Sequence, residues 1–162
     1  MLDSNPDPAG DPLALLFFAF RAVTAEPDRV LAERGLGRVH HRILYFVART
    51  PGIGPGGLLA LLRVSKQALA RPLRELLARG LLEATVPSGD RRTRALALTP
   101  AGARLEARLS GLQRRRFAAA FGATGPAAER GWREVMSQLS REPRGPPRGG
   151  GSRPRGGRPP RR

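Results

Sequence analysis

The chain contains no cysteine among its 162 residues. Disulfide bonds, thiolate zinc sites and redox sensing through a thiol are therefore excluded. Histidine is nearly absent as well, since only His40 and His41 occur. Adjacent residues of a helix point about 100° apart, so these two side chains are poorly placed to chelate one ion together. The sequence predicts no metal and no other cofactor, and we expect both histidines to serve packing or subunit contact.

Acidic residues are few. The chain has 13 Asp and Glu against 29 Lys and Arg, a formal net charge of +16. No paired carboxylates, Ser/His/Asp arrangement or HExxH spacing is present, so we expect no enzyme and no catalytic residues. The surplus of positive charge indicates a polyanionic partner, and nucleic acid is the default choice.

Long hydrophobic runs are missing too. The longest strongly apolar run, residues 13–20, is far shorter than the roughly 20 residues of a membrane-spanning helix. It follows an acidic segment rather than a basic one, which is atypical of a signal peptide. The sequence therefore predicts a cytoplasmic, nucleoid-associated protein with no membrane partner.

The composition changes at both ends of the chain. Residues 1–11 are acidic and contain Pro and Gly, which predicts a flexible lead. Residues 141–162 hold eight arginines, one acid and mostly Pro, Gly and Ser otherwise, which predicts a disordered basic tail. Residues 12–140 are left as the folded domain.

Apolar periodicity and capping residues predict a mainly α-helical domain. A helix over 12–25 is followed, after Pro27, by a short second helix that extends to Leu31. Pro72 is expected to kink the helix in which it lies or to loosen its turn. We expect Gly122 and the Gly125-Pro126 pair to break the long helix that follows Pro100. The remaining predicted helices cover residues 38–49, 55–62, 66–79, 100–121 and 127–139.

A β-hairpin is predicted from residue 82 to residue 98. Apolar and polar residues alternate on both sides of a turn-forming segment, Pro87 to Asp90, and Ile53 is a candidate for a minimal third strand. Thr99 and Pro100 then provide a helix N-cap and a first-turn proline. Three arginines follow the turn at once, which suits a phosphate backbone or a narrow groove: Arg91, Arg92 and Arg94.

Two short helices joined by a tight turn precede this hairpin, an order typical of a winged helix-turn-helix. In the second helix, Leu69, Leu73, Leu76 and Leu77 fall on one face. The opposite face carries residues that suit base edges in the major groove: Lys66, Gln67, Ala70, Arg71 and Arg74. Arg63 and Ser65 precede that helix, and their position predicts phosphate contacts.

The segment around the hairpin resembles the MarR family of winged-helix transcription regulators. The family pattern is matched by Asp90, Arg92, Leu98, Thr99 and Gly102, and Ala95 stands where the family places a larger aliphatic residue. The segments HHRILYF and SKQALARPLREL resemble the PetP-type branch of that family. The resemblance implies that Arg92 enters the minor groove and that Asp90 orients it.

The family also implies a dimer built from the terminal helices and a small-ligand pocket beside them. Surplus apolar surface on the terminal helices agrees with that dimer. We therefore expect residues 12–36 and 100–140 to dimerise and residues 38–99 to bind DNA. Candidate pocket residues are Phe17, Phe20, His40, His41 and Tyr45, although aromatic residues at helical spacing are more often part of a core.

The sequence thus favours a homodimeric regulator of transcription that binds double-stranded DNA at a pseudo-palindromic operator, and the resemblance implies modulation by a small effector. The alternative is a non-specific nucleoid-type or RNA-associated protein, since the Arg/Gly/Pro tail resembles RNA-associated segments. The ratio of specific to non-specific affinity at a stated salt concentration separates the two.

Overall fold

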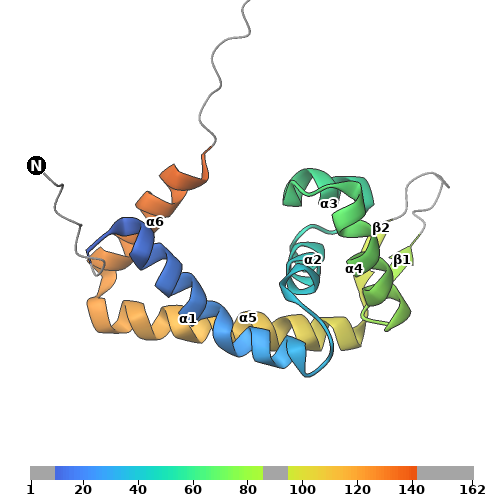
Figure 1. Ribbon diagram of the computed structural model, residues 1–162, viewed down its shortest axis with the longest axis horizontal. Coiled ribbons are helices and arrows are strands. Elements are labelled where there is room, and N and C mark those ends of the chain that lie inside the picture. Colours follow the sequence, from blue (N-terminus) through green and yellow to red (C-terminus); the bar gives the residue numbers. More distant parts are fainter. Residues whose placement is uncertain (1–9, 86–94, 142–162) are drawn as a thin grey trace, which may run out of the picture. The chain divides into compact units, whose positions relative to one another are not determined.

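The structure is a computed structural model that describes residues 10–85 and 95–141 (Figure 1). The chain divides into two compact units, residues 1–123 and residues 124–162. The described elements, in chain order, are α1 (Pro12–Ala32), α2 (Arg38–Arg49), α3 (Pro55–Leu62), α4 (Lys66–Ala78), β1 (Leu82–Thr85), β2 (Ala95–Leu98), α5 (Pro100–Thr124) and α6 (Pro126–Ser140). The predicted fold class is confirmed: the chain is mainly α-helical with one small β-hairpin after a helix-turn-helix.

Helix α1 is longer than predicted. It continues through Pro27 without a break, so the separate short helix expected after this proline is wrong. Pro27 removes one backbone hydrogen bond, but it is buried together with Val30 and Leu31. Burial of this apolar turn stabilises the helix beyond the proline. The helix ends where Gly35 adopts a φ of +60° and Leu36 donates to the carbonyl of Leu31.

Helices α3 and α4 form the predicted helix-turn-helix. Arg63 closes α3 in the left-handed conformation, with a φ of 52°, and is the one non-glycine residue with positive φ in the described part of the chain. Ser65 then caps α4, since its Oγ accepts from the amide of Ala68 at 3.2 Å. Helix α4 continues through Pro72 to Ala78.

The hairpin follows α4 directly. Strands β1 and β2 are antiparallel, with Leu82 opposite Leu98 and Thr85 opposite Ala95. Leu96 also donates to the carbonyl of Ile53 at 2.9 Å. Ile53 therefore makes one strand-like hydrogen bond beside the hairpin, although it belongs to no strand.

Helix α5 begins as predicted, because the hydroxyl oxygen of Thr99 accepts from the amide of Gly102 at 3.1 Å. The expected break at Gly122 is wrong, because this glycine lies within α5, which continues to Thr124, whereas the expected break at Gly125-Pro126 is confirmed. The break falls at Gly125, whose φ of +85° disfavours other residues. Helix α6 follows in the second unit.

The core of the first unit joins α2, α3 and α4 to α5. Ile43 and Leu44 of α2 and Leu58 of α3 are completely buried. Leu76 of α4 and Leu109 of α5 are equally inaccessible and belong to the same cluster. In Figure 1, α2 lies between α3, α4 and the hairpin on one side and α5 on the other. No helix in residues 10–85 and 95–141 is both long and apolar enough to cross a membrane.

Candidate nucleic-acid interface

Helix α4 presents the residues that were predicted to read bases. Its apolar face is held against the core by Leu69 and Leu76, which are 2% and 0% exposed. Every predicted base-reading residue is exposed on the remaining surface: Lys66, Gln67, Ala70, Arg71 and Arg74. The exposed face therefore combines three cationic side chains with one amide, which are the groups that bind guanine and adenine in a major groove.

The two predicted phosphate-contacting residues lie at the N-terminal end of α4. Both Arg63 and Ser65 are exposed in the turn between α3 and α4. The N-terminus of a helix carries unpaired amide groups and a partial positive charge, which favour a phosphate oxygen. The remaining predicted DNA contacts, Asp90, Arg91, Arg92 and Arg94, lie outside the described residues.

A chain of polar contacts connects this face to the start of α2. Nε of Arg71 donates to Oε1 of Glu75 at 2.8 Å, and Nε2 of His40 lies 2.8 Å from Oε2 of the same carboxylate. The amide of Gly37, the residue that precedes α2, donates to Nδ1 of His40 at 2.9 Å. The hydrogen bond from Arg71 and that from His40 lower the pKa of Glu75, so the carboxylate stays ionised.

A cavity of about 230 Å³ lies among α1, α2 and α5. Three of the five predicted pocket residues line it, namely Phe20, His41 and Tyr45. Phe17, which is 57% exposed, and His40, whose ring reaches Glu75 of α4, are not among the lining residues. The other lining residues are Thr24, Pro27, Asp28, Arg38, Arg42, Phe46 and Gln113.

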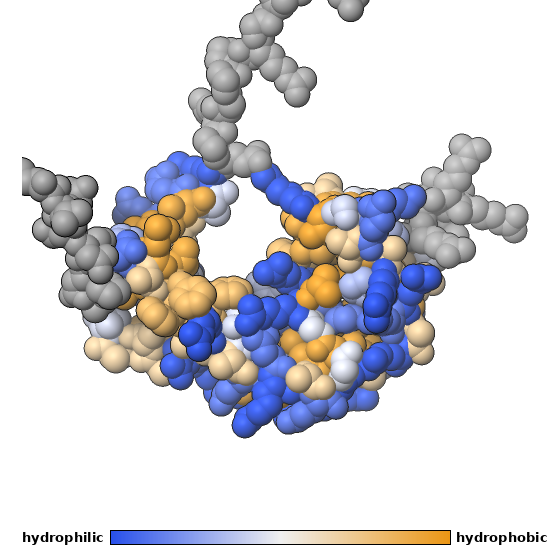
Figure 2. Space-filling model, viewed as in Figure 1, coloured by the Kyte–Doolittle hydropathy of each residue, from blue (hydrophilic) through white to orange (hydrophobic). Residues whose placement is uncertain are grey.

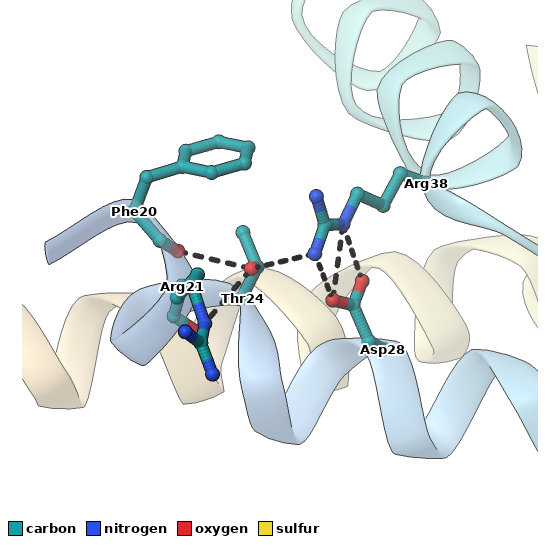
Figure 3. A network of polar contacts seen from close by, with 5 residues as sticks. All are labelled: Phe20, Arg21, Thr24, Asp28 and Arg38. Atoms are coloured by element: carbon teal, nitrogen blue, oxygen red, sulfur yellow. Dashed lines mark hydrogen bonds and ion pairs between the residues drawn. The ribbon is translucent and has the colours of Figure 1, made fainter. Parts of the chain in front are cut away.

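One wall of this cavity carries an ion pair between α1 and α2 (Figure 3). Nη2 of Arg38 lies 2.5 Å from Oδ2 of Asp28 and donates to the hydroxyl of Thr24 at 3.1 Å. The hydrogen bond from Arg38 holds the pKa of Asp28 below its ordinary value. The guanidinium also lies over the ring of Phe20, 5.1 Å from its centroid. These contacts fix the first turn of α2 against α1.

A second polar cluster lies where α2 meets α5. Glu106 of α5 is buried and accepts from Nη1 of Arg49 at 2.8 Å and from the hydroxyl of Ser110 at 2.6 Å. Nε2 of His41 lies 3.4 Å from the Ser110 oxygen. Because the Ser110 proton goes to Glu106, His41 must be the donor in this contact. The two histidines therefore bind different helices, α4 for His40 and α5 for His41.

Comparison with known proteins bears on these features. The sequence pattern of the MarR family matches residues 34–93. The HTH-type transcriptional regulator PetP of Rhodobacter capsulatus is 46% identical over 124 residues, which cover 76% of this chain and 75% of that protein. The chain belongs to the MarR family. It is thus a DNA-binding transcriptional regulator with a winged helix-turn-helix.

Solved structures of MarR-family proteins share the fold. A MarR-family regulator from Silicibacter pomeroyi has a TM-score of 0.67 and 23% identity, with 82% of this chain and 90% of that chain covered. CouR of Rhodococcus jostii RHA1, solved with p-coumaroyl-CoA bound, also has a TM-score of 0.67, with 20% identity and 83% and 95% coverage.

Several residues that shape this MarR-family site are not evident from the sequence. Glu75 has one weak signal, its i,i+4 spacing from Arg71. The contact of Arg38 with Asp28 and that of Arg49 with Glu106 join residues 10 and 57 positions apart. No local pattern indicates such partners, because they depend on how α1, α2 and α5 pack.

The stability of the protein is expected to fall in mild acid because of His41. Burial lowers the pKa of His41 below the ordinary value of 6.5, with Arg49 acting in the same direction and Glu106 and Asp28 opposing it. The unfolded chain therefore takes up this proton first as the pH falls. The contribution of His41 to stability is complete above pH 6.5 and declines below it, through the folded-state pKa.

Urea unfolding between about pH 7.5 and about pH 5.5 tests this expectation. His41→Gln, which has no titrating group, is expected to flatten the pH dependence of the free energy of unfolding. His40 is present in both proteins, so the difference reports on His41 alone. Equal slopes for the two proteins would contradict the expectation.

Proposed function

We propose that this MarR-family regulator binds a pseudo-palindromic operator as a homodimer, each winged-helix unit reading one half-site. The observation that carries the proposal is the exposed face of α4, where Gln67, Arg71 and Arg74 lie opposite the buried Leu69 and Leu76. Two copies related by a twofold axis present two such faces, which accounts for a symmetric DNA site.

Exposed apolar helical surface supports the homodimer. On α1, Leu13 is 75% exposed and Phe17 is 57% exposed, and Figure 2 shows hydrophobic residues on the surface over the N-terminal half of this helix. On α6, Val135 and Leu139 are 54% and 67% exposed. Apolar patches on terminal helices favour burial against a second copy. Residues 12–36 and 100–140 are accordingly assigned to dimerisation and residues 38–99 to DNA binding.

Contacts outside the major groove complete the proposed site. Arg63 and Ser65 bind phosphates at the N-terminal end of α4. The resemblance to the family supports DNA contacts by Asp90, Arg91, Arg92 and Arg94 as well. A narrow minor groove has enhanced negative potential, so an arginine inserted there reads shape rather than base identity.

The cavity among α1, α2 and α5 supports control by a small effector. Phe20 and Tyr45 contribute aromatic surface, and Arg38 and Arg42 contribute positive charge. Its volume of about 230 Å³ is below the roughly 300–1,000 Å³ of common ligand pockets. We therefore propose a small aromatic acid as effector; the related fold of CouR has been solved with a larger acyl thioester, p-coumaroyl-CoA.

Selection from a random duplex library by the full chain tests the proposed function. The expected result is one inverted repeat whose half-site centres lie about one helical turn apart, or a multiple of that distance. Light scattering of the same sample is expected to give the mass of a dimer. Enrichment without any base preference would replace this proposal by a non-specific nucleoid-type or RNA-associated role, and a stable monomer would contradict the dimer.

A further inference from the structure

Glu75 is an unexpected residue on the DNA-facing helix. It is the one acidic residue within α4, whose exposed face otherwise carries Lys66, Arg71 and Arg74. A carboxylate near DNA is repelled by the phosphates and weakens non-specific attraction. Its side chain is 30% exposed, so it lies at the edge of this face rather than in the core. Its contacts indicate what it contributes there.

The contact with His40 has a defined direction. Nδ1 of His40 accepts a hydrogen bond from the backbone amide of Gly37, and a backbone amide is always the donor. Nδ1 therefore carries no proton, and the proton of the neutral ring lies on Nε2. Nε2 in turn donates to Oε2 of Glu75 at 2.8 Å. The ring is 9% exposed and is fixed at both nitrogens, so it holds the carboxylate in place.

Glu75 passes this constraint to Arg71. Oε1 of Glu75 accepts from Nε of Arg71 at 2.8 Å, whereas the Arg71 side chain is 82% exposed. An exposed arginine otherwise samples many rotamers, and ordering it on DNA lowers the affinity. A guanidinium held through Nε keeps its two terminal amino groups for the acceptors of a base.

We propose that Glu75 and His40 are positioning residues for base recognition, which hold the Arg71 guanidinium in its base-reading orientation before DNA arrives. The inference rests on the proposed base-reading role of Arg71. In this proposal, Gly37, His40, Glu75 and Arg71 form one continuous series of hydrogen bonds. The series runs from the start of α2 to the side chain that enters the major groove. Loss of either positioning residue reduces discrimination among bases more than it reduces affinity for DNA in general.

The test uses selection by the full-length protein from a random duplex library, sequenced before and after binding. Arg71→Ala is expected to abolish the preference at one base pair per half-site. Glu75→Gln, which keeps the size of the side chain but not its charge, is expected to reduce the preference at the same base pair by about fivefold. In the Arg71→Ala background, Glu75→Gln is expected to change no preference further, because the two residues act as a unit.

Glu83→Gln is the matched control, because Glu83 lies exposed on β1 of the same winged-helix unit. Both substitutions remove one negative charge, so both are expected to raise affinity for a scrambled duplex slightly. His40→Gln keeps a donor at the position of Nε2 and is expected to retain the base preference, while His40→Leu is expected to reduce it at the same base pair, by no more than Glu75→Gln does.

The positioning role of Glu75 and the base-reading role of Arg71 are refuted by different results. If Arg71→Ala weakens a base preference but Glu75→Gln and Glu83→Gln give identical preferences, the positioning role is overturned and the role of Arg71 stands. If Arg71→Ala leaves every base preference unchanged, the base-reading role of Arg71 is overturned, and the positioning role with it.

Discussion

Gly102→Ala is expected to destabilise the protein by about 3 kcal/mol or more, because an added Cβ would overlap with backbone atoms. A Cβ at this position would lie 1.9 Å from the carbonyl oxygen of Leu81 and 2.9 Å from its carbon. Both are backbone atoms, so no side-chain rotation relieves the overlap. The Leu81 oxygen also accepts from the amide of Thr99 at 3.3 Å, which holds it against the start of α5.

Gly111→Ala in the same helix is the matched control. Its Cβ would meet only a terminal nitrogen of Arg115, at 3.6 Å. Alanine is the better helix former, so this variant is expected to be more stable by about 0.5–1 kcal/mol. Thermal unfolding is expected to show Gly102→Ala melting roughly 10 °C or more below the wild-type protein. Similar melting temperatures for Gly102→Ala and the wild-type protein would contradict the close approach of Leu81 to Gly102.

The role of Gly102 illustrates what the sequence could and could not predict. The hairpin pattern singles out Leu98, Thr99 and Gly102 through its resemblance to a family, and Thr99 is also predictable as a cap from local chemistry. The reason for a glycine at position 102 is a contact with Leu81, 21 positions earlier. Such a contact exists only after α4, the hairpin and α5 have packed together.

The helix boundaries also show that local signals are predictable from the sequence, whereas effects of tertiary packing are not. Capping residues act within three or four positions, so Thr99 predicted the start of α5 correctly, and Ser65 caps α4 through the same kind of local hydrogen bond. Pro27 and Gly122 were predicted to interrupt helices, and both predictions were wrong. Local helix propensity is weak and tertiary burial overrides it at Pro27. Gly122 raises the free energy of α5 by only about 1 kcal/mol, which does not end a helix of this length.

The candidate site was predicted best where one helix face defines it. Periodicity alone placed Gln67, Arg71 and Arg74 on the exposed side of α4. The contacts of the two histidines were harder to predict, because these adjacent buried residues contact two different helices. His40 contacts Glu75 of α4, and His41 contacts Ser110 of α5. Helical geometry predicts that adjacent residues diverge, but not which helix lies on either side.

Glu106→Ala is expected to lower the free energy of unfolding at neutral pH by about 2–3 kcal/mol, because it removes the acceptor that joins α2 to α5. The Glu106 side chain is 9% exposed and that of Arg49 is 33% exposed. This loss is smaller than the roughly 3–5 kcal/mol of a fully buried pair, since Arg49 keeps its hydrogen bond to the Tyr45 carbonyl and its contact with the Tyr45 ring. The Ser110 hydroxyl, which His41 contacts, also loses the carboxylate that accepts its proton.

Glu129→Ala provides the control for an exposed pair, because Glu129 accepts from Arg133 on the surface of α6. Surface pairs contribute about 0–1 kcal/mol, so this variant is expected to unfold close to the wild-type protein. Equal losses for Glu106→Ala and Glu129→Ala would contradict the structural role of the α2–α5 cluster.

The pH dependence of Glu106→Gln separates the charge from the shape of the side chain. Burial alone would raise the pKa of Glu106, but the hydrogen bonds from Ser110 and Arg49 and the charge of Arg49 outweigh it, so the pKa lies below the ordinary 4.5. The carboxylate therefore contributes its stability fully above that ordinary value and loses it as the pH falls through the lower folded-state pKa. Urea unfolding is expected to show wild-type protein more stable than Glu106→Gln at neutral pH, with the difference shrinking below pH 4.5. A difference that stays constant with pH would mean that packing, not ionisation, is what Glu106 contributes between α2 and α5.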